Sequence, residues 1–262
     1  MYMPFFMRGV MELRASVLYG LLLPLLGTSL GAAGVFFLRQ PPRGRLQQGL
    51  QGFAAGIMTA ASVWSLLLPA LARSSYLGTW SFLPAAVGIL GGVGLLHILD
   101  HLLRPLEQAL SEKGVTSPML LLAVALHNLP EGMAVGAVLA GSGGGAAASV
   151  AALSMGIALQ NIPEGAIISL PLRGNAMGRG KAFAVGVLSG VVEPVGALLT
   201  LLLARVVVPL LPYVLSLSAG AMLYVVTEEL VPELREGNRS DVGAVCFAVG
   251  FTVMMALDAA LS

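Results

Sequence analysis

Long apolar segments alternate with short polar ones along the whole chain. Eight segments are apolar over roughly 20 residues or more, the length that an α-helix needs to cross the hydrocarbon core of a bilayer. They lie at about 15–38, 48–72, 79–103, 117–141, 146–170, 181–205, 207–231 and 241–261. Gly and Pro recur inside them, which helices in lipid tolerate better than helices in water. The pattern predicts an all-α polytopic membrane protein with eight transmembrane helices, organised as one domain over residues 1–262.

Composition agrees with this prediction. Hydrophobic residues make up 57% of the 262 residues and charged residues only 10%, with a mean hydropathy of +0.89. A soluble domain would carry about a quarter charged residues. The net charge of +1 gives no indication of nucleic-acid binding. The single cysteine, Cys246, excludes a disulfide within the chain and a metal site built from several thiolates.

Lys and Arg residues gather on one side of the predicted bundle. Ten of the 14 fall in the loops after the first, third, fifth and seventh segments: Arg39, Arg43, Arg45, Arg104, Lys113, Arg173, Arg179, Lys181, Arg235 and Arg239. The other four are Arg8, Arg14, Arg73 and Arg205. Cytoplasmic loops carry the excess of positive residues. We therefore expect both termini outside the cytoplasm, in a multi-pass protein of a cell membrane. The short loops favour a prokaryotic inner membrane.

Two of the segments carry nearly the same hexapeptide near their middle. These are His127-Asn-Leu-Pro-Glu-Gly132 and Gln160-Asn-Ile-Pro-Glu-Gly165, and a third glutamate stands before a proline in Val-Val-Glu193-Pro194. A charged side chain at the centre of a bilayer costs about 2.5–3.5 kcal/mol on insertion scales, so it is rarely there without a partner. A bound cation would compensate all three glutamates at once.

The spacing inside each hexapeptide places two polar side chains on one helix face. Residues four apart lie one above the other, so His127 stands over Glu131, and Gln160 stands over Glu164. One imidazole among carboxylates and amides suits Zn²⁺, Fe²⁺ or Mn²⁺ better than Cu(I). The alternative is that these side chains only hydrogen-bond the helices together. A lone Asn or Gln favours that alternative, but the recurrence of the motif favours a divalent-cation site.

The next residue of each motif, Asn128 or Asn161, is rotated by about 100° around the helix axis. Both amides can therefore serve a second point beside the first. The prolines of the motifs, Pro130 and Pro163, each remove a backbone donor and free a carbonyl. Such freed carbonyls are tolerated at membrane depth only where protein or a wet cavity satisfies them.

With these motifs and eight predicted spans, the chain resembles the ZIP (Zrt/Irt-like) divalent-metal transporters. Gln at the start of the second motif is similar to the GufA-type branch of that family. The resemblance implies a two-metal centre between the fourth, fifth and sixth helices. Its first site would contain His127, Glu131, Gln160 and Glu164, with Met58 as a thioether ligand. Its second site would contain Asn128, Asn161 and Glu193, and would share Glu131 and Glu164.

The resemblance also implies a function and an architecture. The expected function is transport of divalent transition metals into the cytoplasm by alternating access, with zinc favoured and cadmium, iron or manganese as further substrates. The metals are then cargo, and no cofactor is expected. The expected architecture is a 3+2+3 arrangement of helices with an inverted repeat, assembled as a homodimer in the lipid bilayer.

A second polar group lies at the predicted cytoplasmic end. His97, Asp100 and His101 share one face of the third segment, and Glu228 and Glu229 stand near the end of the seventh. Two interpretations stay open. The group is either a metal site on the exit route or a polar helix end that faces water.

An intramembrane zinc-dependent hydrolase is the alternative function, in which Glu131 or Glu164 would activate a zinc-bound water. Catalytic zinc sites usually offer three strong protein ligands and one open position. The predicted centre contains one histidine, and the sequence has no H-E-x-x-H motif. We therefore expect a transporter and not an enzyme.

The two predicted sites should differ in affinity. Some members of the branch that this chain resembles carry Asp where Asn161 stands. With Asn161, three glutamates oppose the four positive charges of two divalent ions, so we expect the second site to bind more weakly. Titration of the purified protein with zinc should give two separate steps, and equal affinities at both sites would contradict this expectation.

Overall fold

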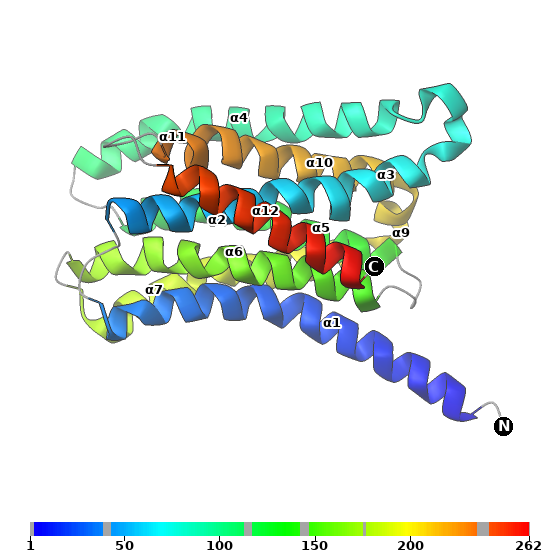
Figure 1. Ribbon diagram of the computed structural model, residues 1–262, viewed down its shortest axis with the longest axis horizontal. Helices are drawn as coiled ribbons and strands as arrows, with labels where there is room; N and C mark the ends of the chain where they lie inside the picture. Colours follow the sequence, from blue (N-terminus) through cyan, green and yellow to red (C-terminus); the bar gives the residue numbers. More distant parts are fainter. Residues whose placement is uncertain are drawn as a thin grey trace.

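The computed structural model describes residues 3–38, 43–112, 117–141, 147–174, 177–234 and 241–261. These residues form a bundle of long helices, and no β-strand occurs among them (Figure 1). The prediction of an all-α protein is confirmed for this part of the chain.

The first half of the bundle contains three long helical segments. The elements, with 3-10 and π segments written as η, are α1 (Met3–Ala32), η1 (Ala33–Phe36), α2 (Arg45–Ala61), η2 (Ser62–Leu67), α3 (Leu68–Arg73), η3 (Ser75–Trp80) and α4 (Leu83–Glu112). Helix α2 continues through the π segment η2 into α3, so these three elements form one long rod.

The second half begins with the two helices that carry the hexapeptides. Its elements are α5 (Ser117–Gly141), α6 (Ala147–Gly174), α7 (Arg179–Gly190), α8 (Val192–Leu202), α9 (Ala204–Val207), η4 (Val208–Leu210), α10 (Leu211–Val225), the π segment η5 (Val226–Leu230), α11 (Val231–Glu233) and α12 (Val242–Leu261).

Six helical rods in the described part of the chain are long and apolar enough to cross a membrane. They are Val17–Phe36, Arg45–Arg73, Leu83–Leu103, Arg179–Leu202, Ala204–Glu228 and Val242–Leu261. Helices α5 and α6 have 25 and 28 residues, which at 1.5 Å per residue gives lengths of about 37 and 42 Å. The prediction of eight spans therefore requires that α5 and α6 also cross the membrane, in addition to these six rods.

Prolines shape the helices in different ways. Helices α5 and α6 pass through Pro130 and Pro163 without a break. The sixth predicted segment, 181–205, is not one helix, because α7 and α8 meet at a turn at Val191. Pro194 explains this difference, since it offers no N–H to the carbonyl of Gly190 and its ring crowds that carbonyl.

Four pairs of helices approach closely through glycines. Gly27 of α1 faces α6, Gly56 of α2 faces α12, Gly92 of α4 faces α10, and Gly132 of α5 faces α8. At each position a Cβ atom would overlap a backbone carbonyl oxygen of the partner helix. Small residues of this kind allow the close backbone contact that stabilises helix pairs in a membrane.

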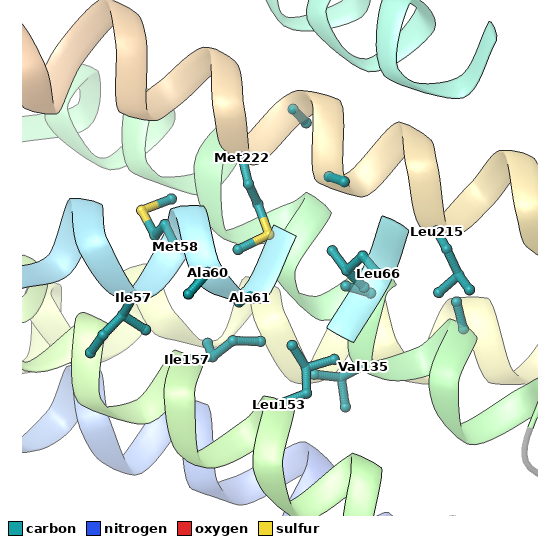
Figure 2. Close-up of a cluster of buried hydrophobic side chains, with 14 of the residues drawn as sticks. Ile57, Met58, Ala60, Ala61, Leu66, Val135, Leu153, Ile157, Leu215 and Met222 are labelled. Atoms are coloured by element: carbon teal, nitrogen blue, oxygen red, sulfur yellow. The ribbon is translucent and has the colours of Figure 1, made fainter. Parts of the chain in front are cut away.

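The largest buried apolar cluster lies where α2, α5, α6 and α10 meet (Figure 2). Its labelled members include Ile57, Met58 and Leu66 from the α2–η2 rod and Met222 from α10. Val135 of α5 and Leu153 and Ile157 of α6 complete its lower side in Figure 2. This cluster therefore joins the helices that carry the hexapeptides to the rest of the bundle.

Basic residues lie at both ends of the bundle. Helix α1 begins and α12 ends at one end, shown at the right of Figure 1, together with the end of α3 and with α9. That end carries Arg73 and Arg205. The opposite end contains the start of α2 with Arg45, the end of α6 with Arg173 and the start of α7 with Arg179.

The glycine contacts predict an asymmetry between two Gly→Ala substitutions. Gly56→Ala should destabilise the protein by about 1–3 kcal/mol, the usual cost of overpacking, because its Cβ would overlap the carbonyl oxygen of Phe247. Gly94→Ala is the matched control, since nothing lies within 4 Å of a Cβ there. Thermal unfolding in detergent should show a lower midpoint for Gly56→Ala alone, and equal midpoints would contradict the packing.

Candidate metal centre

The polar residues of the two hexapeptides and of α8 are buried together in the interior. Asn128 and Glu131 of α5, Gln160 and Asn161 of α6, and Glu193 of α8 are each at most 2% exposed. Helix α5 packs against both α6 and α8. The two motifs and the third glutamate are thus brought into one region of the bundle.

One hydrogen bond links the two motifs directly. The Gln160 amide nitrogen donates to Glu131 Oε1, from α6 to α5. The first residue of the second motif therefore pairs with the glutamate of the first motif. A hydrogen bond to a charged group is stronger than one between neutral groups, so this contact stabilises the α5–α6 interface at the centre.

A second set of hydrogen bonds converges on Glu193. Its Oε1 atom accepts from Asn128 Nδ2 at 3.1 Å, from Asn161 Nδ2 at 2.9 Å and from Thr28 Oγ1 at 3.2 Å. The two amides also approach backbone carbonyls, Asn128 at Ser189 (3.2 Å) and Asn161 at Pro24 (3.3 Å). Residues from α1, α5 and α6 therefore meet at one carboxylate oxygen of α8.

The other oxygens of these side chains form a group of acceptors without donors. Among the described residues, no hydrogen-bond partner is present for Glu131 Oε2, Glu193 Oε2, Gln160 Oε1, Asn128 Oδ1 and Asn161 Oδ1. Native proteins bury few such atoms, because an unpaired buried oxygen carries its full desolvation cost. Five such oxygens on three neighbouring helices would be stabilised by a positive charge placed among them. Carboxylate and amide oxygens are the ligands that hard and borderline divalent cations accept.

No Lys or Arg of α5, α6 or α8 lies beside these buried oxygens. Helices α5 and α8 contain no Lys or Arg, and the Arg of α6, Arg173, lies in its last turn. A carboxylate in an apolar interior needs a compensating charge or several donors. A cation that enters from outside would supply that charge.

The other predicted ligands lie in different surroundings. Glu164 is half-buried on α6. Met58 belongs to the apolar cluster of Figure 2, and its predicted role as a thioether ligand stays a prediction. The His127 side chain lies outside the described residues. Among the side chains that the structure does describe, no group of three His, Cys, Asp or Glu could hold a metal ion. At Glu131 and Glu193, amide groups occupy the positions next to the carboxylates.

The second polar group takes shape where α4 packs against α10. The rings of His97 and His101 are nearly parallel, with centroids 6.2 Å apart, and His97 meets the Tyr224 ring edge-on at 6.1 Å. Tyr224 Oη donates to Asp100 Oδ2 at 3.3 Å. Glu228 is exposed on η5, while the Glu229 side chain lies outside the part of the chain that is described.

Two residues of these groups were not predicted. Tyr224 stands four residues before Glu228, and this helical spacing was a signal that could have identified it. Thr28 follows Pro24 by four residues in an apolar helix. A threonine in that setting usually bonds to the carbonyl four residues back, so its sequence context gave no signal for Glu193.

The family model and the known proteins that this chain is similar to are all described as zinc transporters. The family model described as ZIP Zinc transporter matches residues 106–258. Zinc transporter ZIP11 of Xenopus tropicalis is 33% identical over 315 residues, covering 89% of this chain and 94% of that protein. Zinc transporter GufA of Myxococcus xanthus is 35% identical, with 90% and 96% covered. Zinc transporter ZIPB of Bordetella bronchiseptica is 35% identical, with 89% and 77% covered.

The unpaired oxygens predict that a divalent metal stabilises the folded protein. A ligand that binds only the folded state at 100 times its Kd adds about 2.7 kcal/mol. Zinc should therefore raise the thermal unfolding midpoint in detergent, and a chelator should reverse the rise. Glu131→Gln should reduce the effect. Asp241→Asn, which removes an exposed carboxylate, is the control and should retain it. An equal rise in both variants would place the zinc elsewhere.

Proposed function

The chain belongs to the ZIP zinc transporter family, and from this membership we propose that it moves divalent transition-metal ions across a cell membrane into the cytoplasm. Zinc is the proposed principal substrate, because the relatives described above are named zinc transporters. Cadmium, iron and manganese are proposed as further substrates. The observation that carries the proposal is the group of buried, unpaired acceptor oxygens on α5, α6 and α8.

The proposed centre holds two metal ions. The first would be bound by His127, Glu131, Gln160 and Glu164, with Met58 as a further ligand. The second would be bound by Asn128, Asn161 and Glu193, with Glu131 and Glu164 shared. The hydrogen bonds support this division, since Gln160 pairs with Glu131 and both asparagines pair with Glu193. Each contact joins residues of one proposed site.

Amide ligands suit a metal that has to be released. Gln160, Asn128 and Asn161 are neutral, and each carries both a donor and an acceptor. Where a cation binds, the amide presents oxygen to it. Where no cation is bound, the same group can present nitrogen to the neighbouring carboxylate, which is the contact that Gln160 makes with Glu131 and the two asparagines make with Glu193. Transport requires binding that is favourable enough to enter and weak enough to leave, and this exchange lowers the cost of leaving.

The apolar cluster of Figure 2 gives the proposed route a direction. Val135 follows Glu131 by one turn of α5, and Ile157 precedes Gln160 by one turn of α6. This part of the cluster therefore lies toward the end of the bundle where Arg73 of α3 donates to the carbonyl of Gly141 at the end of α5. The predicted loops and termini on this side contain four of the 14 Lys and Arg residues, so we take this end to face outward. We infer that apolar packing closes the outer route in this conformation.

The helix contacts support movement of two groups of helices against each other. The proposed moving group contains α1, α5, α6 and the α7–α8 rod, and the other contains α2–α3, α4, α10 and α12. All four close glycine pairs lie within a group: α1 with α6 and α5 with α8 in one, α2 with α12 and α4 with α10 in the other. Alternating access needs rigid groups with a less tightly joined surface between them.

The same pairs support an inverted repeat of the 3+2+3 type. Such a repeat exchanges the first three spans with the last three, and α5 with α6. Under this exchange the pair α1–α6 corresponds to the pair α8–α5, and the pair α2–α12 corresponds to the pair α10–α4. All four of these pairs are in close glycine contact. The π segments η2 and η5 fall in exchanged spans, and a proline follows each of them, Pro69 and Pro232.

The group at the opposite end completes the proposed pathway. We propose that metal on its way to the cytoplasm binds to His97, Asp100 and His101 with Tyr224, and then to Glu228 and Glu229.

A homodimer within the bilayer is also part of the proposal. Val87, Leu90 and Ile98 are exposed along α4 and give an apolar face to lipid or to a second copy.

The hydrolase alternative has no support from the relatives, which are named transporters.

Uptake of radiolabelled zinc into proteoliposomes tests the function. Wild-type protein should give saturable uptake, and Glu131→Ala or Glu164→Ala should abolish it, because each removes a bridging charge. Asp241→Ala, at an exposed carboxylate, is the matched control and should transport normally. Competition by Cd²⁺, Fe²⁺, Mn²⁺ and Mg²⁺ would rank the substrates. Absence of uptake by well-folded wild-type protein would contradict the proposal.

A further inference from the structure

Thr28 brings a hydroxyl group from α1 to the proposed metal centre. The side chain is fully buried, and its Oγ1 lies 3.2 Å from Glu193 Oε1 and 3.5 Å from the carbonyl oxygen of Pro24. A hydroxyl has one proton, so it cannot donate fully to both. The next residue, Ser29, shows the usual alternative, since its hydroxyl donates to the Leu25 carbonyl within the helix at 2.6 Å. The Thr28 hydroxyl is instead closest to the carboxylate.

Two glycines hold Thr28 in this position. Gly165, the last residue of the second hexapeptide, faces the backbone of Thr28 so closely that a Cβ would overlap its carbonyl oxygen. Gly190 of α7 faces the side chain, and a Cβ there would lie 2.9 Å from both Cβ and Oγ1 of Thr28. The threonine therefore has little freedom to turn away from Glu193.

The two hexapeptides place Thr28 and Glu193 in corresponding positions. Gly132 ends the first motif and faces the backbone carbonyl of Glu193, just as Gly165 ends the second motif and faces that of Thr28. Relative to α6, Thr28 thus stands where Glu193 stands relative to α5. The repeated motif positions one polar side chain on each flanking helix, a glutamate on one and a threonine on the other.

The donors to Glu193 differ in what they can do when a cation arrives. Asn128 and Asn161 donate through their amide nitrogens, while their Oδ1 atoms have no partner among the described residues. An amide nitrogen does not bind a cation, so each asparagine has to turn its oxygen inward and give up its bond to Glu193. The hydroxyl of Thr28 is the donor that can stay.

We propose that Thr28 is a positioning residue of the transport centre. Its hydroxyl holds Glu193 Oε1 in place while Asn128 and Asn161 exchange hydrogen bonding for metal binding. This inference rests on the proposed function, since it assumes that the two asparagines and Glu193 form the second metal site. Thr28 itself acts through Glu193.

Zinc titration of purified protein by calorimetry tests this role. Thr28→Val keeps the shape of the side chain and removes the hydroxyl. A hydrogen bond to a charged group is worth enough that the second, weaker binding step should weaken about ten-fold or more, while the first step stays within about two-fold of wild type. Thr28→Ser keeps a hydroxyl and should restore the second step.

Thr200→Val is the matched control. Thr200 is also a buried threonine, on the same helix as Glu193, but its hydroxyl donates to the Gly196 carbonyl within that helix at 2.9 Å. Loss of this hydroxyl should leave both steps unchanged. If Thr28→Val does not fold, Thr28→Ala fits the same space and carries the same expectation.

The outcomes separate this inference from the proposed function. Two wild-type binding steps in Thr28→Val would overturn the role of Thr28 and leave the transporter proposal intact. A weakened second step in Thr28→Ser as well would assign the effect to packing and would also overturn it. A wild-type protein that binds no divalent metal would overturn the proposed function itself, and this inference with it.

Discussion

Glutamates buried in an apolar bundle have to be compensated, and helices α5 and α8 contain no Lys or Arg that could do so. The compensation present in the structure comes from neutral hydrogen-bond donors. One amide donates to Glu131, and two amides and a hydroxyl donate to Glu193. Among the described residues, no donor is present for the other oxygen of each of these two carboxylates or for the carbonyl oxygens of the amides. Neutral donors therefore hold the carboxylates in place but leave acceptor oxygens that the proposed divalent cation would bind.

The close helix packing follows from this constraint. A short amide can reach a carboxylate on another helix only if the two backbones approach closely. The glycines that end the hexapeptides allow this approach, Gly132 toward Glu193 and Gly165 toward Thr28. The repeated six-residue motif thus has two roles. Its polar residues supply the hydrogen-bonding groups, and its glycine allows the two helix backbones to come close enough for these groups to meet.

In the proposed mechanism, the rest of the bundle controls access to the centre. The glycine pairs join the helices into two groups, and Val135 and Leu153 of the apolar cluster in Figure 2 lie between the candidate centre and the end of α5. Packed apolar side chains exclude water and ions. At the opposite end the cluster borders polar side chains, since its member Tyr224 contacts His97 and Asp100. In the proposed mechanism, the cargo would leave the centre on the side of these polar residues.

Features that depend on local spacing were determined by the sequence alone: the apolar lengths of the helices, the i, i+4 pairs of the two hexapeptides, and the family that they resemble. Features that depend on contacts between distant segments were decided only by the tertiary structure. It was Pro194 that divided the sixth segment at Val191, and packing between α1, α6 and α7 that brought Thr28 to Glu193. The structure also decided that the asparagine nitrogens, and not their oxygens, face that carboxylate. The physical reason is that spacing along a helix determines which side chains share a face, whereas the identity of the facing helix, and hence the partner of each polar atom, is a property of the whole bundle.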